Sequence, residues 1–263
     1  MSIYFSLRML SDSKYIKPSL NEKFEGIIWK IEIDDKFPVV AIESRQADRH
    51  NTSFSAFNFE TGECLFKEIT VEDSWKWSLD RVSNNLVFIH SYLSEETPEH
   101  QGIIALDQRG TIKWQQHNKA LHTIAEEGLI ITDPKVQGKW FDILNAENGV
   151  LLKSFASNYT PVPRDIIVPD FIYDKALLPI PLPENTIGEI AFKAHNNKII
   201  ACYHVANGNS FTQKLLISQK DELLLEDNLA HNILKRNPEA FFISHNHLFC
   251  IRDEKREIVS YLV

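Results

Sequence analysis

Residues 56–66 read AFNFETGECLF, an apolar strand, a short polar turn that ends near a glycine, and a second apolar strand. The same arrangement returns at 105–114, ALDQRGTIKW, and at 143–152, ILNAENGVLL. An Asn or Asp side chain opens each turn by bonding the turn's own backbone, and glycine takes the positive φ that strains other residues. The three stretches therefore predict three β-hairpins of one type.

A further apolar strand precedes each of these hairpins, at 38–44, 86–92 and 128–132. Two later segments, 198–225 and 240–261, follow the same order of strands without the glycine. Equivalent second-strand positions, Val40, Val87, Ile130, Ile200 and Phe242, are 42 to 47 residues apart except for one separation of 70, which contains an insertion of about 25. A unit of about 45 residues has the length of a propeller blade. First strands of the five units are expected at 27–33, 75–79, 120–124, 187–192 and 230–234.

We predict an all-β fold, a β-propeller of about five, or else six, four-stranded antiparallel blades. A small sheet that buries one face only against its neighbour needs an array that closes. A large sandwich or an open meander with coincidental spacing is the alternative. In the fourth strands of the blades we expect aromatic residues to pack between neighbouring blades: Phe66, Trp114, Phe155 and Tyr261.

Residues 1–263 are predicted to form a single domain with a proline-rich insertion at about 156–186. Proline keeps a long loop extended without strands of its own, as in a lid or a partner-docking arm. Phe171 and Tyr173 are the expected contact residues of such an arm. The alternative is a segment that covers one blade edge. At the other end of the chain, residues 3–7 are expected to add a strand to the last blade or to belong to a sixth.

The hairpins at 56–66 and 105–114 resemble the quinoprotein type of propeller repeat (PQQ-like), whose blades end in a strand, a turn with glycine, and a strand with tryptophan. The resemblance covers three of the five units and implies turn and packing roles. Quinone-dependent dehydrogenases of that type carry an adjacent-cysteine disulfide, whereas Cys64, Cys202 and Cys250 lie far apart. The resemblance therefore brings no quinone cofactor. The chain is also similar to uncharacterised bacterial propeller-like domains of unknown function.

Composition excludes several classes of partner. The net charge is −8 and the lysines and arginines are scattered, so we expect no nucleic-acid binding. No uncharged apolar run approaches the roughly 20 residues of a spanning helix, which predicts no membrane association. We see no signal peptide and expect the three cysteines to be reduced, so a cytoplasmic location is predicted.

Histidines and carboxylates gather in the loops of one predicted rim, where a propeller binds its ligands. His245 and His247 are alternate residues, which share a face on an extended strand and could hold one ion. We name four candidate metal ligands: His245, His247, His50 and Asp227. A solvated turn is the alternative for the pair. The wider set comprises His90, His100, His117, His204, Asp48, Asp73, Asp165 and Asp170.

Trp75 and Trp77 are also alternate residues and are candidates for stacking a sugar or a base. Packing between blades is the usual role of large aromatic side chains, and Trp29 occupies the matching strand of the first unit, which favours packing.

The repeated hairpins predict a fold, but their turn and packing residues do not indicate a function. No phosphate loop, zinc-spaced cysteine set or nucleophile motif is present, so no catalytic residue is predicted. We expect a non-catalytic binding domain that uses the loop-bearing rim to hold a protein or peptide partner. The alternatives are a metal-dependent hydrolase or lactonase-like propeller, and a small-molecule or carbohydrate sensor. No cofactor is predicted, and a divalent metal is the alternative that the hydrolase would need.

Overall fold

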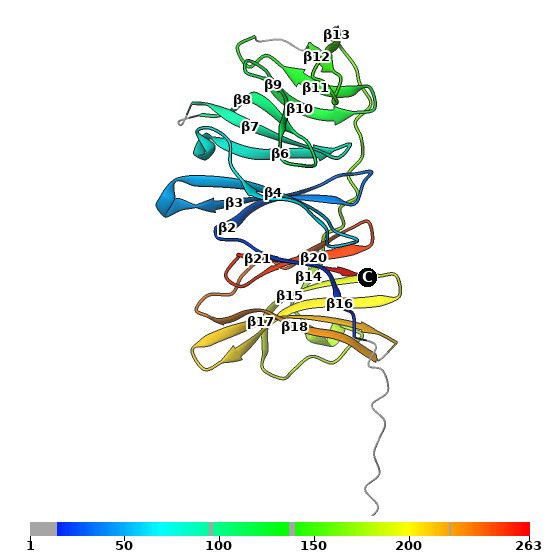
Figure 1. Ribbon diagram of the computed structural model, residues 1–263. Coiled ribbons are helices and arrows are strands. Elements are labelled where there is room, and N and C mark those ends of the chain that lie inside the picture. The colour runs from blue at the N-terminus through cyan, green and yellow to red at the C-terminus, as the bar shows by residue number, and fades with distance from the viewer. Residues whose placement is uncertain (1–14, 95–96, 137–139, 221) are drawn as a thin grey trace, which may run out of the picture. The chain divides into compact units, whose positions relative to one another are not determined.

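The computed structural model describes residues 15–263 except 95–96, 137–139 and 221, and it is all-β (Figure 1). Its strands form five antiparallel sheets, four of four strands and one of five. The chain divides into two compact units. The larger unit contains Pro18–Val168 and Ala240–Leu262, and the smaller is built around Pro169–Glu239.

The larger unit holds four sheets, each named by its strands. The β2–β5 sheet contains β2 (Ile27–Ile33), β3 (Val39–Gln46), β4 (Asn51–Asn58) and β5 (Cys64–Ile69). The β6–β9 sheet contains β6 (Trp77–Ser83), β7 (Leu86–Ser94), β8 (Thr97–Leu106) and β9 (Ile112–Gln116). The β10–β13 sheet contains β10 (Ala120–Ala125), β11 (Gly128–Thr132), β12 (Phe141–Leu144) and β13 (Leu151–Ala156). The fourth sheet, in the order β19-β20-β21-β1, contains β1 (Pro18–Lys23), β19 (Phe241–Ser244), β20 (His247–Arg252) and β21 (Glu257–Leu262).

The smaller unit holds the β14–β18 sheet. Its strands are β14 (Asp170–Ile172), β15 (Thr186–His195), β16 (Lys198–Asn207), β17 (Ser210–Gln219) and β18 (Glu222–Ile233). The helices of the described residues are single 3-10 turns, η1 (Ala47–Arg49), η2 (Ser74–Lys76) and η3 (Lys175–Leu177). None of these helices is long or apolar enough to cross a membrane.

The predicted hairpin turns are confirmed. The Asn58 side-chain oxygen accepts hydrogen bonds from the amides of Glu60 and Thr61, both at 3.0 Å. The Gly62 amide donates to the Asn58 carbonyl, and Gly62 has a φ of 74°. Asp107 and Asn145 open their turns in the same way.

An N-terminal strand completes the sheet formed by the C-terminal strands. β1 pairs with β21, so residues 18–23 supply the fourth strand there. The predicted first strand at 230–234 is wrong, because most of this segment continues β18, the outer strand of its sheet. Residues 3–7, expected to supply an added strand, lie outside the described residues. The three cysteines are free, and Cys64 is exposed.

The proline-rich segment also differs from the expected plain loop. It forms β14, which pairs with β15 and makes this sheet five-stranded rather than four-stranded. The segment spans the boundary between the two units, at Val168 and Pro169. The single domain over 1–263 stays a prediction.

Neighbouring sheets of the larger unit share hydrophobic cores, and the sheets follow one another face to face in Figure 1. Val40 and Ile42 of β3 pack toward the fourth sheet, which contains β1 and β19 to β21. Val39 and Ala41 of the same strand pack toward the β6–β9 sheet. Both faces of β3 are therefore buried, which explains its unbroken apolar run.

Three of the four aromatic residues expected between blades are buried or half-buried, namely Phe66, Trp114 and Tyr261. Phe155 is 74% exposed, so the prediction is wrong for this residue. Its backbone has a φ of 56° at an irregularity in the pairing of β12 with β13. Such a bulge re-aims a side chain, which is the reason that Phe155 leaves the core.

Candidate metal centre

A β-bulge at the same place in three sheets is the starting point of the site. β2, β6 and β10 each pair with the next strand, and in each pairing one residue is skipped, Trp29, Asp80 and His122 respectively. A bulge inserts one extra residue and re-aims its side chain, and bulges occur often beside functional sites. The bulge in β6 directs Asp80 toward β7 and β8.

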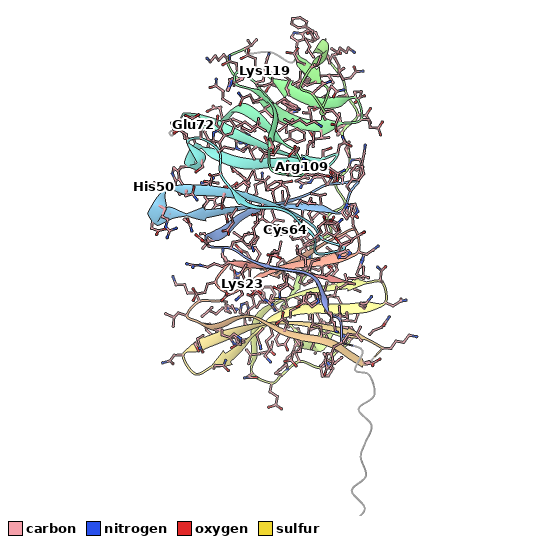
Figure 2. All side chains as sticks on the ribbon, in the orientation of Figure 1. Lys23, His50, Cys64, Glu72, Arg109 and Lys119 are labelled. Atoms are coloured by element: carbon pink, nitrogen blue, oxygen red, sulfur yellow. The ribbon has the colours of Figure 1, made fainter. Side chains whose placement is uncertain are left out.

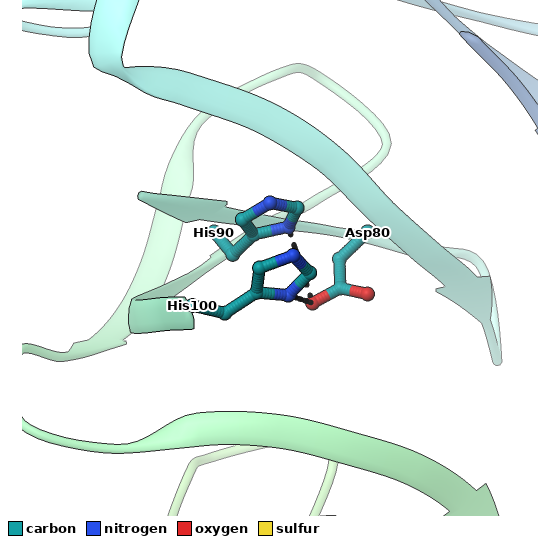
Figure 3. Close-up of side chains that lie close together, drawn as sticks. All are labelled: Asp80, His90 and His100. Carbon is teal, nitrogen blue, oxygen red and sulfur yellow. Dashed lines mark ion pairs between the residues drawn. The ribbon is translucent and has the colours of Figure 1, made fainter. Parts of the chain in front are cut away.

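Two histidines from these strands meet Asp80 (Figure 3). His90 lies on β7, and His100 lies on β8 opposite Tyr92. The Oδ2 atom of Asp80 is 3.4 Å from Nδ1 of His90 and 4.0 Å from Nδ1 of His100. The two imidazole rings stack with centroids 3.4 Å apart and planes inclined by 12°.

Asp80 and His90 are buried, and three of their polar atoms are unsatisfied. His90 is 2% exposed and Asp80 is 8% exposed. Oδ2 of Asp80 and both ring nitrogens of His90 have no hydrogen-bond partner. Leaving buried polar atoms unpaired is costly, so such a group in a native structure calls for an explanation such as an ion.

The surroundings favour neutral imidazole at His100. Burial lowers its pKa, and His90 and Lys30 act in the same direction, while Asp80 opposes them. A neutral imidazole has a free lone pair and is the form that binds a metal. His100 is half-buried, so one side of the cluster reaches solvent.

The donor set fits a transition metal. Bonds of about 2.1 Å at tetrahedral angles separate two ligand atoms by about 3.4 Å. Oδ2 of Asp80 and Nδ1 of His90 have this separation, whereas Nδ1 of His100 is 4.0 Å from Oδ2 and has to move closer to complete the site. Two imidazoles and one carboxylate suit zinc and its neighbours better than calcium or magnesium, which prefer oxygen ligands. In the described part of the chain, no other three His, Cys, Asp or Glu side chains bring ligand atoms within 4.8 Å of one another.

Aromatic side chains flank the cluster. The Tyr92 ring lies 5.2 Å from His90 and 5.6 Å from His100 and is partly exposed. Trp77 begins β6 and lies against Gly102, which has a φ of 79° beside a register shift between β7 and β8. A side chain at Gly102 would also approach the Ser91 hydroxyl, so glycine allows the strands this close approach.

The four metal ligands predicted from the sequence are placed apart from this cluster. His50 ends η1 at the tip of the β3–β4 hairpin, exposed to solvent, with its ring 5.3 Å from Trp75 (Figure 2). Asp227 lies on β18 of the smaller unit. Neither residue joins a three-ligand group among the described residues.

His245 and His247 are not alternate residues of one strand. His245 and Asn246 form the two-residue turn between β19 and β20, with φ of 49° and 61°, and the His245 amide donates to Asp165. His247 begins β20, is buried beside Phe59, and has Nδ1 3.2 Å from the Ser19 hydroxyl. The backbone at His245 and Asn246 is therefore a turn, as the alternative interpretation of this pair had it, and His247 lies on the strand that follows.

The predicted partner-contact residues have different surroundings. Trp75 lies in η2, not on a strand, and is exposed, whereas Trp77 is half-buried against the core between the β2–β5 and β6–β9 sheets. Phe171 on the edge strand β14 and Tyr173 just after it are both exposed. The Tyr173 hydroxyl donates to Glu189.

Sequence reasoning placed His90 and His100 in a broad set of loop histidines and missed Asp80. Asp80 directly follows the predicted first strand at 75–79, where no polar ligand was expected. The available signal was a carboxylate ten residues before one histidine and twenty before another.

The comparisons with known proteins name no activity. Residues 33–114 match a family model described as a domain of unknown function, DUF4905. The matched segment contains Asp80, His90 and His100. A comparison with curated proteins finds none that matches this chain.

Proposed function

We propose that Asp80, His90 and His100 bind a divalent transition metal, best zinc, and that the protein is a metal-dependent hydrolase. The observation that supports this most is that Asp80, His90 and His100 bring one ligand atom each within 4.8 Å of one another, while Oδ2 of Asp80 and both ring nitrogens of His90 are buried without a hydrogen-bond partner. Such atoms gain most from an ion that satisfies them.

Three protein ligands would leave a coordination position open, as in catalytic zinc sites. Zinc lowers the pKa of a bound water to about 7, which makes a nucleophile available near neutral pH. The half-buried side of His100 gives a substrate access from solvent. The Tyr92 ring, which is partly exposed and lies 5.6 Å from that of His100, would contact the substrate.

Metal binding tests this proposal. We expect the chelator-treated protein to bind one zinc ion in calorimetry, and we expect Asp80→Asn and His90→Gln to weaken binding strongly. His50→Gln is the matched control and should bind as the wild type does. The zinc-loaded protein should then hydrolyse a member of an ester, lactone and phosphoester panel, and Asp80→Asn should not. Absence of binding, or equal binding by Asp80→Asn, would overturn the site. Binding without hydrolysis would overturn the hydrolase.

We also propose that the sheets are blades of a propeller of about five blades, forming one domain with quinoprotein-like repeats. Face-to-face cores between successive sheets and the pairing of β1 with β21 support it. Small-angle X-ray scattering distinguishes the arrangements, because a closed ring is more compact than an open array of the same sheets.

A second candidate function is the binding of a cytoplasmic protein or peptide through the proline-rich segment. Phe171 and Tyr173 are exposed apolar residues at the edge of a sheet, where extended peptides add strands. Phe171→Ala with Tyr173→Ala should abolish affinity for a purified partner found by pull-down. Leu177→Ala, an exposed residue of the same segment, is the control. Unchanged affinity of the double variant would exclude this surface.

A third candidate is a carbohydrate sensor at Trp75. The Arg45 guanidinium packs 4.9 Å from the ring centre of Trp29 and 5.3 Å from that of Trp75, and both indoles are exposed. A sugar ring stacks on such a face. Oligosaccharides should quench tryptophan fluorescence in the wild type and not in Trp75→Ala. Equal responses of the two proteins would contradict this candidate.

A further inference from the structure

The bulge that aims Asp80 is held by side chains of the neighbouring sheet. A bulge disrupts the ladder of backbone hydrogen bonds, so nearby backbone groups need other partners. The Lys30 ammonium, from β2, donates to the carbonyl oxygens of Leu79 at 2.9 Å and Asp80 at 3.2 Å. Lys30 thus binds the carbonyl groups of the two peptide bonds that flank Asp80.

A second side chain binds the same segment of β6. Glu43 of β3 is fully buried, and its Oε2 accepts hydrogen bonds from the Leu79 amide and the Ser78 hydroxyl, both at 2.7 Å. Lys30 therefore occupies carbonyl groups of the bulge, while Glu43 occupies an amide. These contacts cross from the β2–β5 sheet to the β6–β9 sheet.

Both charges are compensated, so neither side chain is free to turn away. Glu43 accepts a 2.5 Å hydrogen bond from Nε of Arg45 through its other oxygen. The Lys30 ammonium lies 3.4 Å from Oε1 of Glu32, which also pairs with Arg81 and Arg164. A buried carboxylate in such a network is held in a single geometry by charge-assisted hydrogen bonds.

The register of β6 shows why this matters for the metal centre. Leu79 pairs with Ile89 and Arg81 with Phe88, so Asp80 has no partner in the ladder. A slip of one residue in a strand moves each side chain to the opposite face. Removing the bulge would therefore turn the carboxylate away from the two histidines.

We propose that Lys30 and Glu43 are positioning residues of the metal centre, which keep the β6 bulge and so hold the Asp80 carboxylate against His90 and His100. The inference rests on the proposed metal site. Outer residues that orient metal ligands typically change metal affinity by about 10- to 100-fold when they are replaced.

The test is zinc calorimetry of Lys30→Met and Glu43→Gln, with thermal unfolding of the metal-free proteins to confirm that they fold. We expect affinity about 10- to 100-fold weaker than wild type. Lys67→Met is the matched control, because the Lys67 side chain is 35% exposed and Lys30 is 34% exposed, and each pairs with a glutamate. Lys67→Met should bind zinc normally. If Lys30→Met does not fold, Lys30→Gln, which keeps an amide donor, takes its place.

Two further measurements separate positioning from general support of the sheet interface. In the Asp80→Asn background, Lys30→Met should cause no further loss of affinity, because the ligand it positions is gone. The visible spectrum of the cobalt-substituted protein should also change in both variants, which reports altered coordination. The proposal would be overturned if Lys30→Met weakened zinc binding as much in the Asp80→Asn background as in the wild type. It would also be overturned if the folded variants kept the zinc affinity and the cobalt spectrum of the wild type. Failure of the wild type to bind any metal would overturn the metal site itself, and this inference with it.

Discussion

The imidazole rings of His90 and His100 stack with centroids 3.4 Å apart and planes inclined by only 12°. The lone pairs of an imidazole lie in its ring plane, so the two stacked rings hold their lone pairs in separate and nearly parallel planes. One ion can bind both rings only if one of them turns. His100 is half-buried and His90 is 2% exposed, so His100 is the ring with freedom to turn.

Zinc is therefore expected to break this stack. In nitrogen-detected NMR spectra, zinc should shift a ring nitrogen of both His90 and His100, and the protons of His100 should lose the shielding from its neighbour. His117→Gln identifies signals that do not belong to the site. A shift confined to one of the two histidines would show that they do not share the ion.

The buried polar atoms of the site that lack hydrogen-bond partners lower the free energy of unfolding of the metal-free protein. Replacing His90 by leucine removes two buried nitrogens that have no hydrogen-bond partner. Because such an atom costs about 1 to 3 kcal/mol, we expect His90→Leu to raise the free energy of unfolding of metal-free protein by about that amount. Urea unfolding in the presence of a chelator measures this. Zinc should stabilise the wild type and leave the variant unchanged. A less stable metal-free variant would indicate that His90 has a structural partner.

We expect His245 to have a backbone role in the turn between β19 and β20 and not to bind a metal. Its φ of 49° lies in the left-handed region, where asparagine is well tolerated and β-branched residues are not. His245→Asn should keep the stability of the wild type, whereas His245→Val should lose about 1 to 2 kcal/mol. Thermal unfolding compares the two variants. Equal stability of both would contradict a turn role, and loss of zinc binding in His245→Asn would make this histidine a ligand.

Stability should depend on pH through His247. Burial lowers its pKa from 6.5; Glu60 opposes this effect and His245 adds to it. The unfolded chain therefore binds more protons than the folded one just below pH 6.5, and the free energy of unfolding falls as the pH drops below that value. Above it this contribution is constant.

The measurement is urea unfolding at a series of pH values. His247→Gln should lose less stability on acidification than the wild type does, while His231→Gln, at an exposed position on β18, should behave as the wild type. His204 still contributes in the variant, because burial lowers its pKa as well. An unchanged pH dependence in His247→Gln would show that its ring is protonated equally in both states.

Local chemistry explains which parts of the fold could be predicted. The turn at Asn58 and Gly62 depends on residues four apart in sequence, and the same side chains make the same hydrogen bonds wherever they occur. The unbroken apolar run of β3 likewise follows from burial of both its faces. Strand pairs joined by short turns were therefore predictable from the sequence.

The site depended on features that no local pattern contains. Asp80 faces His90 and His100 because β6 skips one residue in its pairing, and a period-two pattern assumes that no residue is skipped. The two histidines belong to strands whose register is set by the bulge near Gly102. Likewise, β1 pairs with β21 across almost the entire sequence, and a pattern of neighbouring strands contains no signal for so distant a partner.

The most direct test of the central claim is a crystal structure of the zinc-loaded protein with anomalous scattering measured at the zinc edge. We predict one anomalous peak about 2.1 Å from Asp80 Oδ2 and from a ring nitrogen of each of His90 and His100. We also predict that the two rings are no longer parallel. A peak bound instead by His245 and His247, or a stacked and unoccupied pair at saturating zinc, would contradict the central claim.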